Sequence, residues 1–396
     1  MNSVETEVVR RPLLTPTAVA HVVFVPTGIM TVLLGPVLPS LAARWSLNDA
    51  QAGELFSAQF LASTVGVALS GVLVPRLGYR VVLVLGLSFM ALGVGTLPLG
   101  SWALGMSSVA CFGVGLGLAI PTANLLVAEV NPDRRASALA LLNFSWSVGA
   151  VACPFLLAPF QKAERTSTFL VVLGVGIALL AACLAGVWLP RPGKGVDQVT
   201  AKDQSLVHLM QSPAAIVLGL LFFLYVGTES AVGGWLASYA KRIADHAGTM
   251  WVAMPSFFYG TLLLGRALAP IALRHLSDVK VARLGLATAV LGVVGLVTSG
   301  SLAGVAASAC VIGLGFSAIY PITIALLSHT FGTAATRLGS VMFALAGFGG
   351  AFIPWLVGFS STEMSSLKLG LMVPLVGAAA MLVLYFRAWE MPPQNT

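Results

Sequence analysis

Long apolar segments separated by short polar ones fill the chain from residue 17 to residue 388. A helix needs about 20 mostly apolar residues to cross the hydrocarbon core of a bilayer, and twelve segments meet this requirement. Because lipid offers no hydrogen-bond partners to an open backbone, these segments are predicted to be helices. We therefore expect an all-α integral membrane protein with transmembrane helices near 17–41, 51–74, 81–99, 102–129, 136–160, 167–189, 213–240, 249–273, 281–299, 302–330, 338–360 and 367–388.

The second part of the chain repeats a pattern of the first part, 200 residues later. Such a repeat indicates an internal duplication, so we predict two pseudo-symmetric halves of six helices each, 1–189 and 213–396. The polar stretch 190–212 between them is rich in Pro, Gly and charge, which is typical of a linker. The recurring residues are Gly113, Gly115, Pro121, Gly149 and Pro154 in the first copy and Gly313, Gly315, Pro321, Gly349 and Pro354 in the second.

The distribution of positive charge predicts the orientation in the membrane. An even number of crossings puts both termini on one side, and Lys and Arg are enriched in cytoplasmic loops. With the N-terminus inside, fourteen Lys and Arg residues fall on the cytoplasmic side and six on the outer side, while Arg266 lies within a span. We predict a multi-pass protein of the bacterial inner (plasma) membrane with both termini in the cytoplasm.

Composition agrees with a membrane protein and disfavours other classes. Hydrophobic residues make up 58% of the chain and charged residues 9%, whereas soluble domains carry about 25% charge. The net charge of +7 lies mostly at helix ends, so topology explains it better than nucleic-acid binding. The four cysteines show no metal-ligand spacing. We expect no cofactor, no metal and no nucleic acid; the expected partners are the lipid bilayer and a small molecule, and the protein is expected to be a monomer.

A short motif after the second predicted span suggests a family. The stretch GVLVPRLGYR at 71–80 resembles the loop signature of the major facilitator superfamily, Gly-x-Leu-x-Asp-Arg-x-Gly-Arg-Arg/Lys. The resemblance implies the major facilitator fold, in which a site between two six-helix halves opens alternately to each side of the membrane. The matching residues are Gly71, Leu73, Arg76, Gly78 and Arg80, while Pro75 stands in place of the Asp and Tyr79 in place of an Arg.

Four further stretches resemble the fucose-permease-like branch of sugar transporters within this superfamily. Together they cover both halves of the chain, and they imply a small neutral sugar or polyol as the substrate and symport with protons. The stretches are GPVLPSLAARWSLNDAQAG at 35–53, LNFSWSVGAVACP at 142–154, FLYVGTESAVGGWLASYA at 223–240 and SFFYGTLLLGRALAP at 256–270.

Two charged residues, Glu229 and Arg266, clearly lie inside predicted spans. A charge at mid-bilayer costs about 2.5–3.5 kcal/mol on the gentlest scale, so each needs a reason to be there. Burial disfavours the ionised form of a carboxyl group, which makes Glu229 the candidate for proton coupling. Helix geometry places Arg266 roughly 10 Å nearer the cytoplasm. We expect Arg266 to serve an inner gate or a polar cluster of the second half, and a Glu229–Arg266 pair is the alternative.

Polar and aromatic side chains within the spans are the candidate substrate ligands. Sugars present C–H faces that stack on rings and hydroxyl groups that bond with polar groups. The alternative for each residue is helix packing, in which another helix supplies the partner of a buried amide. The candidates are Gln59, Asn124, Asn143, Trp146, Tyr225, Glu229, Trp235, Tyr259 and Tyr320. The candidate gating residues are Arg76, Arg80, Glu129, Arg134, Arg135 and Arg266.

We considered three classes of function for this sequence. The first is a secondary transporter of a sugar or polyol that is driven by protons, with sodium coupling or uncoupled facilitation as variants. The second is an exporter of amphipathic, drug-like compounds, which would favour a more apolar site with fewer amides. The third, an enzyme or receptor, is disfavoured because the chain shows no nucleophile–base or metal-ligand constellation and no sizeable soluble domain.

Overall fold

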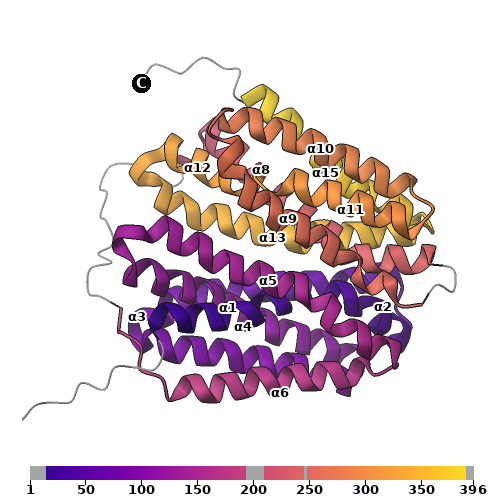
Figure 1. The fold of residues 1–396 in the computed structure, drawn as a ribbon, viewed down its shortest axis with the longest axis horizontal. Helices are drawn as coiled ribbons and strands as arrows, with labels where there is room; N and C mark the ends of the chain where they lie inside the picture. Colours follow the sequence, from indigo (N-terminus) through magenta and orange to yellow (C-terminus); the bar gives the residue numbers. More distant parts are fainter. Residues whose placement is uncertain (1–14, 193–208, 245–247, 389–396) are drawn as a thin grey trace, which may run out of the picture.

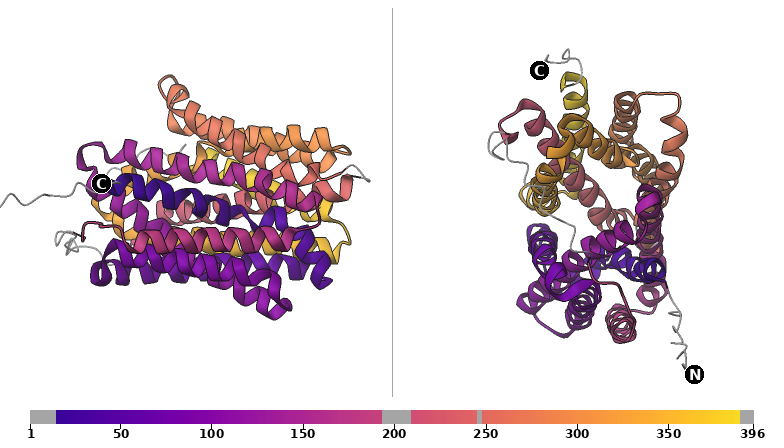
Figure 2. Two further views of the ribbon diagram at one scale, coloured as in Figure 1. Left: turned by 60° about the horizontal axis from the view of Figure 1, so that its bottom comes forward. Right: turned by 90° about the vertical axis from the view of Figure 1, so that its left-hand side faces the viewer.

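A computed structural model describes residues 15–192, 209–244 and 248–388 of the chain. The helices of the first half and those of the second form two groups that lie side by side, with their axes running in similar directions (Figure 1). The end-on view shows the same two groups (Figure 2, right). Most of the predicted linker 190–212 lies outside the described residues.

The described structure is built from helices and the turns between them. The first half contains α1 (Pro16–Val32), α2 (Leu34–Trp45), α3 (Asp49–Thr96), α4 (Trp102–Val130), α5 (Arg135–Lys162) and α6 (Thr166–Ala185). The second half contains α8 (Pro213–Ile243), α9 (Met254–Ala272), α10 (Asp278–Thr298), α11 (Leu302–Phe316), α12 (Ile319–Phe331), α13 (Ala335–Glu363), α14 (Leu367–Gly370) and α15 (Met372–Ala388).

The number of membrane crossings agrees with the sequence. In the described part of the chain, ten helical segments are long and apolar enough to cross a bilayer, and the bent pair α1–α2 gives an eleventh crossing. Helix α3 has 48 residues and is about 72 Å long, more than twice the roughly 30 Å of hydrocarbon. It breaks at Gly78, where φ is +80° and ψ is 165°, values that favour glycine. Dividing α3 there gives twelve crossings, so the predicted all-α fold is confirmed.

Prolines explain where three of the spans are interrupted. A proline has no N–H to donate to the carbonyl four residues earlier, and its ring clashes with that turn of helix. The chain bends by 44° between α1 and α2, and α11–α12 and α14–α15 are also interrupted. These interruptions lie three or four residues before Pro36, Pro321 and Pro374. The bends therefore follow from backbone chemistry that is visible in the sequence.

Helices α1 and α5 approach closely because each presents a glycine to the backbone of the other. A Cβ on Gly28 would lie 1.9 Å from the carbonyl oxygen of Trp146, and a Cβ on Gly149 would lie 2.0 Å from that of Val25. No larger side chain fits at either place, so the two glycines set the distance between the helices. This contact fixes Trp146 against α1.

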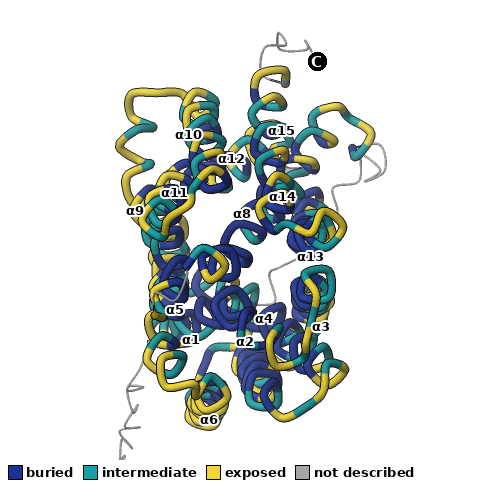
Figure 3. Tube along the Cα trace, turned by 90° about the vertical axis from the view of Figure 1, so that its right-hand side faces the viewer, coloured by how far each residue is buried: buried dark blue, intermediate teal, exposed yellow. Residues whose placement is uncertain are grey.

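The two halves pack on each other through α3 with α13, α2 with α8 and α5 with α9. Several of these contacts lie near the turn 46–48, where Asp49 meets Arg242 and Ala50 meets Thr362. We term this end of the bundle the outer end, following the predicted topology, and the opposite end, with the turn 131–134, the inner end. A view from the outer end shows buried parts of α2 and α8 near the centre (Figure 3).

The α1–α5 contact gives a test of the fold. Gly149→Ala should lower the Tm of the purified protein, because overpacking at such a contact costs about 1–3 kcal/mol. Gly176→Ala is the matched control, since a Cβ there would meet no atom within 4 Å. Thermal unfolding in detergent measures both. An unchanged Tm for Gly149→Ala would show that the helices are free to move apart.

Candidate functional site

The two charged residues predicted within spans form a pair. Glu229 of α8 and Arg266 of α9 lie with 3.9 Å between a carboxylate oxygen and a guanidinium nitrogen, and their side chains are 15% and 23% exposed. This separation is longer than a hydrogen bond of about 2.7–3.2 Å, so charge attraction holds the pair. The Nε of Arg266 is buried and has no hydrogen-bond partner. Arg266 therefore belongs to a polar cluster of the second half and keeps a donor unused.

Three tyrosines surround this pair, and each was a predicted ligand. The rings of Tyr225 and Tyr320 stack with their centroids 5.5 Å apart. The Tyr225 hydroxyl donates to a backbone carbonyl of α11 over 3.2 Å and lies close enough to Glu229 and Arg266 to interact with both. The same two charges act on Tyr259 and Tyr320. The structure thus gathers aromatic rings, a carboxylate and a guanidinium in one place.

Tyr259 connects the polar cluster with the first half. Its ring lies edge-on to Trp146 of α5, with the centroids 6.4 Å apart. The indole nitrogen of Trp146 donates to the hydroxyl of Thr31 in α1 over 3.3 Å, and the amide nitrogen of Gln59 in α3 donates to the Thr31 carbonyl over 3.0 Å. The Oε1 of Gln59 is buried without a partner. A row of contacts therefore crosses the interface and ends at an unused acceptor.

The two asparagines bond within their own helices. Asn124 donates to the carbonyl of Ile120 and Asn143 donates to that of Leu139, each over 2.9 Å. Asn124 is half-buried and Asn143 is exposed. Since residues three apart share a helix face, Asn143 lies on the same side of α5 as Trp146, one turn nearer the inner end. Its position is compatible with the predicted role, and one of the two N–H groups of its amide is already used.

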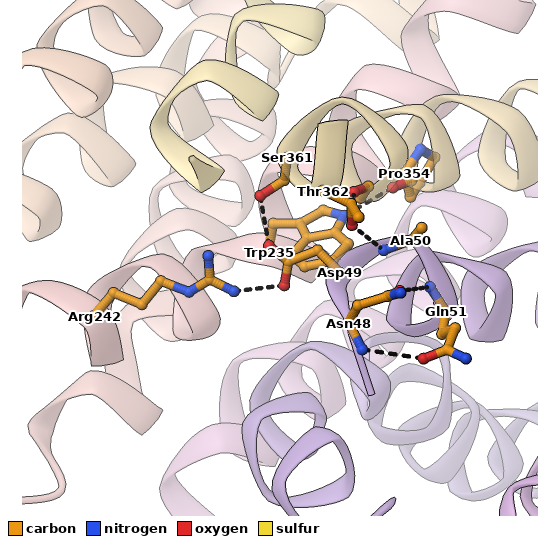
Figure 4. A network of polar contacts seen from close by, with 10 residues as sticks. Asn48, Asp49, Ala50, Gln51, Trp235, Arg242, Pro354, Ser361 and Thr362 are labelled. Carbon is orange, nitrogen blue, oxygen red and sulfur yellow. Dashed lines mark hydrogen bonds and ion pairs between the residues drawn. The ribbon is translucent and has the colours of Figure 1, made fainter. Parts of the chain in front are cut away.

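Trp235 lies at the outer end, next to Asp49 and Thr362, as Figure 4 shows. Its side chain is 1% exposed, and its indole nitrogen donates to the carbonyl of Pro354 over 2.9 Å. Its ring packs on Phe56, with the centroids 6.0 Å apart. In this conformation Trp235 joins α8 to α13 and α3, and its one N–H is used. The side chain therefore has no free polar atom for the predicted contact with a substrate.

The other predicted gating residues belong to the first half and lie at its inner end. The hydroxyl of Tyr79 donates to the carboxylate of Glu129, and Arg135 donates to the carbonyl of Ala128 over 3.2 Å. Tyr79, which stands in place of an Arg of the family signature, was not among the predicted gating residues. The nearby acid Glu129, which was a predicted gating residue, could have pointed to Tyr79 as its partner. The exposed members of the set are Arg76, Arg80, Arg134 and Arg135.

The sequence profile of the Major Facilitator Superfamily matches residues 21–354, and the chain belongs to this family. The chain is 25% identical over 370 residues to a glucose/galactose transporter of Brucella abortus (strain 9-941), a match that covers 88% of each chain. It is 24% identical over 281 residues to sodium-dependent glucose transporter 1 of Homo sapiens, covering 62% of this chain and 54% of that one.

A solved structure shows the same fold. A bacterial homolog to the human lysosomal transporter Spinster, in an inward-facing and unoccupied conformation, superposes with a TM-score of 0.79 at 14% identity. The match covers 94% of this chain and 96% of that chain. Together with the membrane-spanning helices, the family identifies an integral membrane transporter and not an enzyme.

The ion pair can be tested by a double-mutant cycle. Arg266→Met should lower the Tm in detergent more than Arg266→Met combined with Glu229→Gln, because the single change leaves a carboxylate without its partner. A coupling of about 1 kcal/mol is expected. Thermal unfolding of the parent, both single variants and the double variant measures it. Additive effects would show that the two side chains do not interact.

Proposed function

We propose that the protein is a secondary active transporter that moves a small neutral sugar or polyol across the membrane by alternating access, coupled to protons through Glu229. The glucose/galactose transporter of Brucella abortus and the human sodium-dependent glucose transporter support the substrate class. The observation that carries the proposal is the 3.9 Å Glu229–Arg266 pair beside Tyr225, Tyr259 and Tyr320.

The chemistry of this cluster suits a neutral hydroxylated ligand. When Glu229 is ionised, its charge and that of Arg266 cancel, so the site then carries no net charge that would attract a charged substrate. The tyrosine rings offer faces for the C–H groups of a sugar. A hydroxyl group both donates and accepts hydrogen bonds, and it can therefore satisfy either the unused Nε of Arg266 or the unused Oε1 of Gln59. An amphipathic drug-like compound would leave these buried polar atoms unpaired.

In the proposed cycle, the proton on Glu229 and the sugar bind cooperatively. An ionised Glu229 is the counter-ion of Arg266 and holds its guanidinium. When Glu229 takes up a proton, Arg266 loses that counter-ion and its N–H groups turn to the hydroxyl groups of the sugar. Each ligand then raises the affinity for the other, as linkage requires. A sodium ion that neutralises Glu229 would act in the same way. Because the human relative is a sodium-dependent transporter, the test below includes a sodium gradient.

The packing of the halves supports alternating access. They are held together at the outer end, where Arg242 pairs with Asp49 and Ser57 donates to the carbonyl of Ala351 over 2.8 Å. Because the halves are joined at the outer end, we assign this conformation as inward-facing. Rocking of one half against the other would then close the inner end and open the outer one.

The substrate and the coupling ion can be tested together in proteoliposomes. Labelled glucose, galactose, xylose and a polyol are offered with an inward proton gradient, with an inward sodium gradient and with neither. Accumulation of one sugar under the proton gradient alone is the expected result. Accumulation under sodium alone would replace the proton by sodium, and equilibration without accumulation would indicate a facilitator. The absence of uptake of every sugar would contradict the proposed substrate class.

Replacing the proposed proton carrier should separate coupling from transport. Glu229→Gln keeps the size of the side chain but cannot ionise, so uphill accumulation is expected to disappear while exchange of labelled for unlabelled sugar continues. Glu164→Gln is the control, because Glu164 is exposed between α5 and α6. Counterflow and gradient-driven uptake measure the two activities. Normal accumulation by Glu229→Gln would remove Glu229 from the coupling mechanism.

Substrate protection tests whether Asn143 faces the transport path. In a variant whose four native cysteines are replaced, Asn143→Cys should react with a water-soluble maleimide, and saturating sugar should slow that reaction. Leu141→Cys is the matched control, since Leu141 is 58% exposed on the same helix and points about 160° away from Asn143. Equal labelling of Asn143→Cys with and without sugar would mean that Asn143 lies outside the path.

A further inference from the structure

One carboxylate at the outer end joins three helices of both halves. Asp49 is the first residue of α3 in the first half. One of its carboxylate oxygens pairs with Arg242 of α8, and the other accepts a hydrogen bond from the hydroxyl of Ser361 in α13. Both partners belong to the second half, and Figure 4 shows them on two sides of Asp49. Both carboxylate oxygens of Asp49 therefore contact residues of the other half.

The backbone of the same helix end is capped from the other half. The first four N–H groups of a helix have no partners within the helix. The side chain of Asn48 accepts from the N–H of Gln51 over 2.8 Å. The neighbouring N–H, that of Ala50, donates to the hydroxyl of Thr362 in α13 over 2.9 Å. The turn itself thus supplies a capping box between Asn48 and Gln51, and the second half of the protein supplies one further cap.

The backbones behind these contacts lie too close for water. A Cβ on Gly358 would lie 2.2 Å from the carbonyl oxygen of Asp49, and a Cβ on Gly35 would lie 2.8 Å from that of Gly233. A small, partly open cavity of about 180 Å³ lies at this interface, and Asp49, Trp235, Ser238 and Arg242 help to line it. Ser238 is only 7% exposed. A Cys at position 238 is therefore largely shielded while the halves stay packed, and separation of the halves would expose it.

We propose that Asp49, Arg242, Ser361 and Thr362 form a latch that holds the outer end closed and sets how often the transport site opens to the outside. When the halves separate, the Asp49 carboxylate loses Arg242 and Ser361, and the N–H of Ala50 loses its bond to Thr362. The proposal rests on the alternating access proposed above. It adds the residues that bias the equilibrium between the two conformations, and it is independent of the substrate.

Asp49 is the central member of this outer latch. Arg242 is 47% exposed, and an exposed ion pair by itself contributes little. The Asp49 side chain is only 17% exposed and takes part in two charge-assisted contacts, which are stronger than neutral hydrogen bonds. Its place at the N-terminus of α3 also favours its negative charge. Removing the Asp49 carboxylate should therefore open the outer end more than removing Arg242.

Labelling of a cysteine behind the latch tests the proposal without any sugar. In a variant that lacks the native cysteines, Ser238→Cys is exposed to a water-soluble maleimide in detergent, where both ends are accessible. Asp49→Ala should raise the labelling rate about five-fold or more, and Arg242→Gln should raise it less. Arg44→Gln is the matched control, because Arg44 is also an arginine of the outer end but donates to Ser167 within its own half. Its labelling rate should equal that of the parent.

A reversible cross-link keeps the test decisive if Asp49→Ala folds poorly. Ala50→Cys combined with Thr362→Cys should form a disulfide across the latch, and oxidation should stop the labelling of Ser238→Cys until a reductant is added. Labelling that continues in the oxidised protein would overturn the latch, as would rates for Asp49→Ala and Arg242→Gln equal to that of Arg44→Gln. Failure of sugar uptake with normal labelling changes would instead count against the proposed substrate and leave the latch in place.

Discussion

The hydrocarbon of the bilayer cannot hydrogen-bond, and this constraint governs the structure at every level. It makes each span a helix, because only a helix satisfies its backbone internally. It also makes every buried polar side chain expensive unless a partner is present. Glu229 and Arg266 lie next to each other for this reason, and both interact with the neighbouring Tyr225. Among the described residues, the exceptions are the Nε of Arg266, the Oε1 of Gln59 and the Oγ1 of Thr228, which are buried without a partner.

Small residues and prolines shape the scaffold around this pair. Gly28 and Gly149 bring α1 and α5 into backbone contact, which positions Trp146 next to Tyr259 of the other half. A proline follows a 44° bend between α1 and α2, and another follows the interruption between α11 and α12. The cluster at Glu229 is therefore positioned by contacts between helices as much as by the helices that carry it.

Two kinds of contact connect the halves, and they lie at different depths. At the outer end, Asp49 makes charged and hydrogen-bonded contacts to α8 and α13. Deeper in the bundle, the Trp146–Tyr259 contact is a weak aromatic one, and it lies beside polar atoms that have no partner. A strong contact at one end and an unsatisfied site in the middle suit a protein that closes on one side while it keeps its centre ready for a ligand.

The sequence by itself determined the spans, the duplication and the presence of Glu229 and Arg266 in apolar helices, because hydrophobic length and mid-span charge are local properties. The break at Gly78 and the proline bends also follow from local chemistry. Tertiary structure decided which side chains meet. Helix spacing alone put Glu229 and Arg266 on different levels, yet the side chains reach within 3.9 Å, and Trp235 turned to Pro354 instead of the polar cluster. In the sequence, Asp49 and Arg242 look like ordinary charges at helix ends. They are 193 residues apart, and their contact can be recognised only when their helices are packed together.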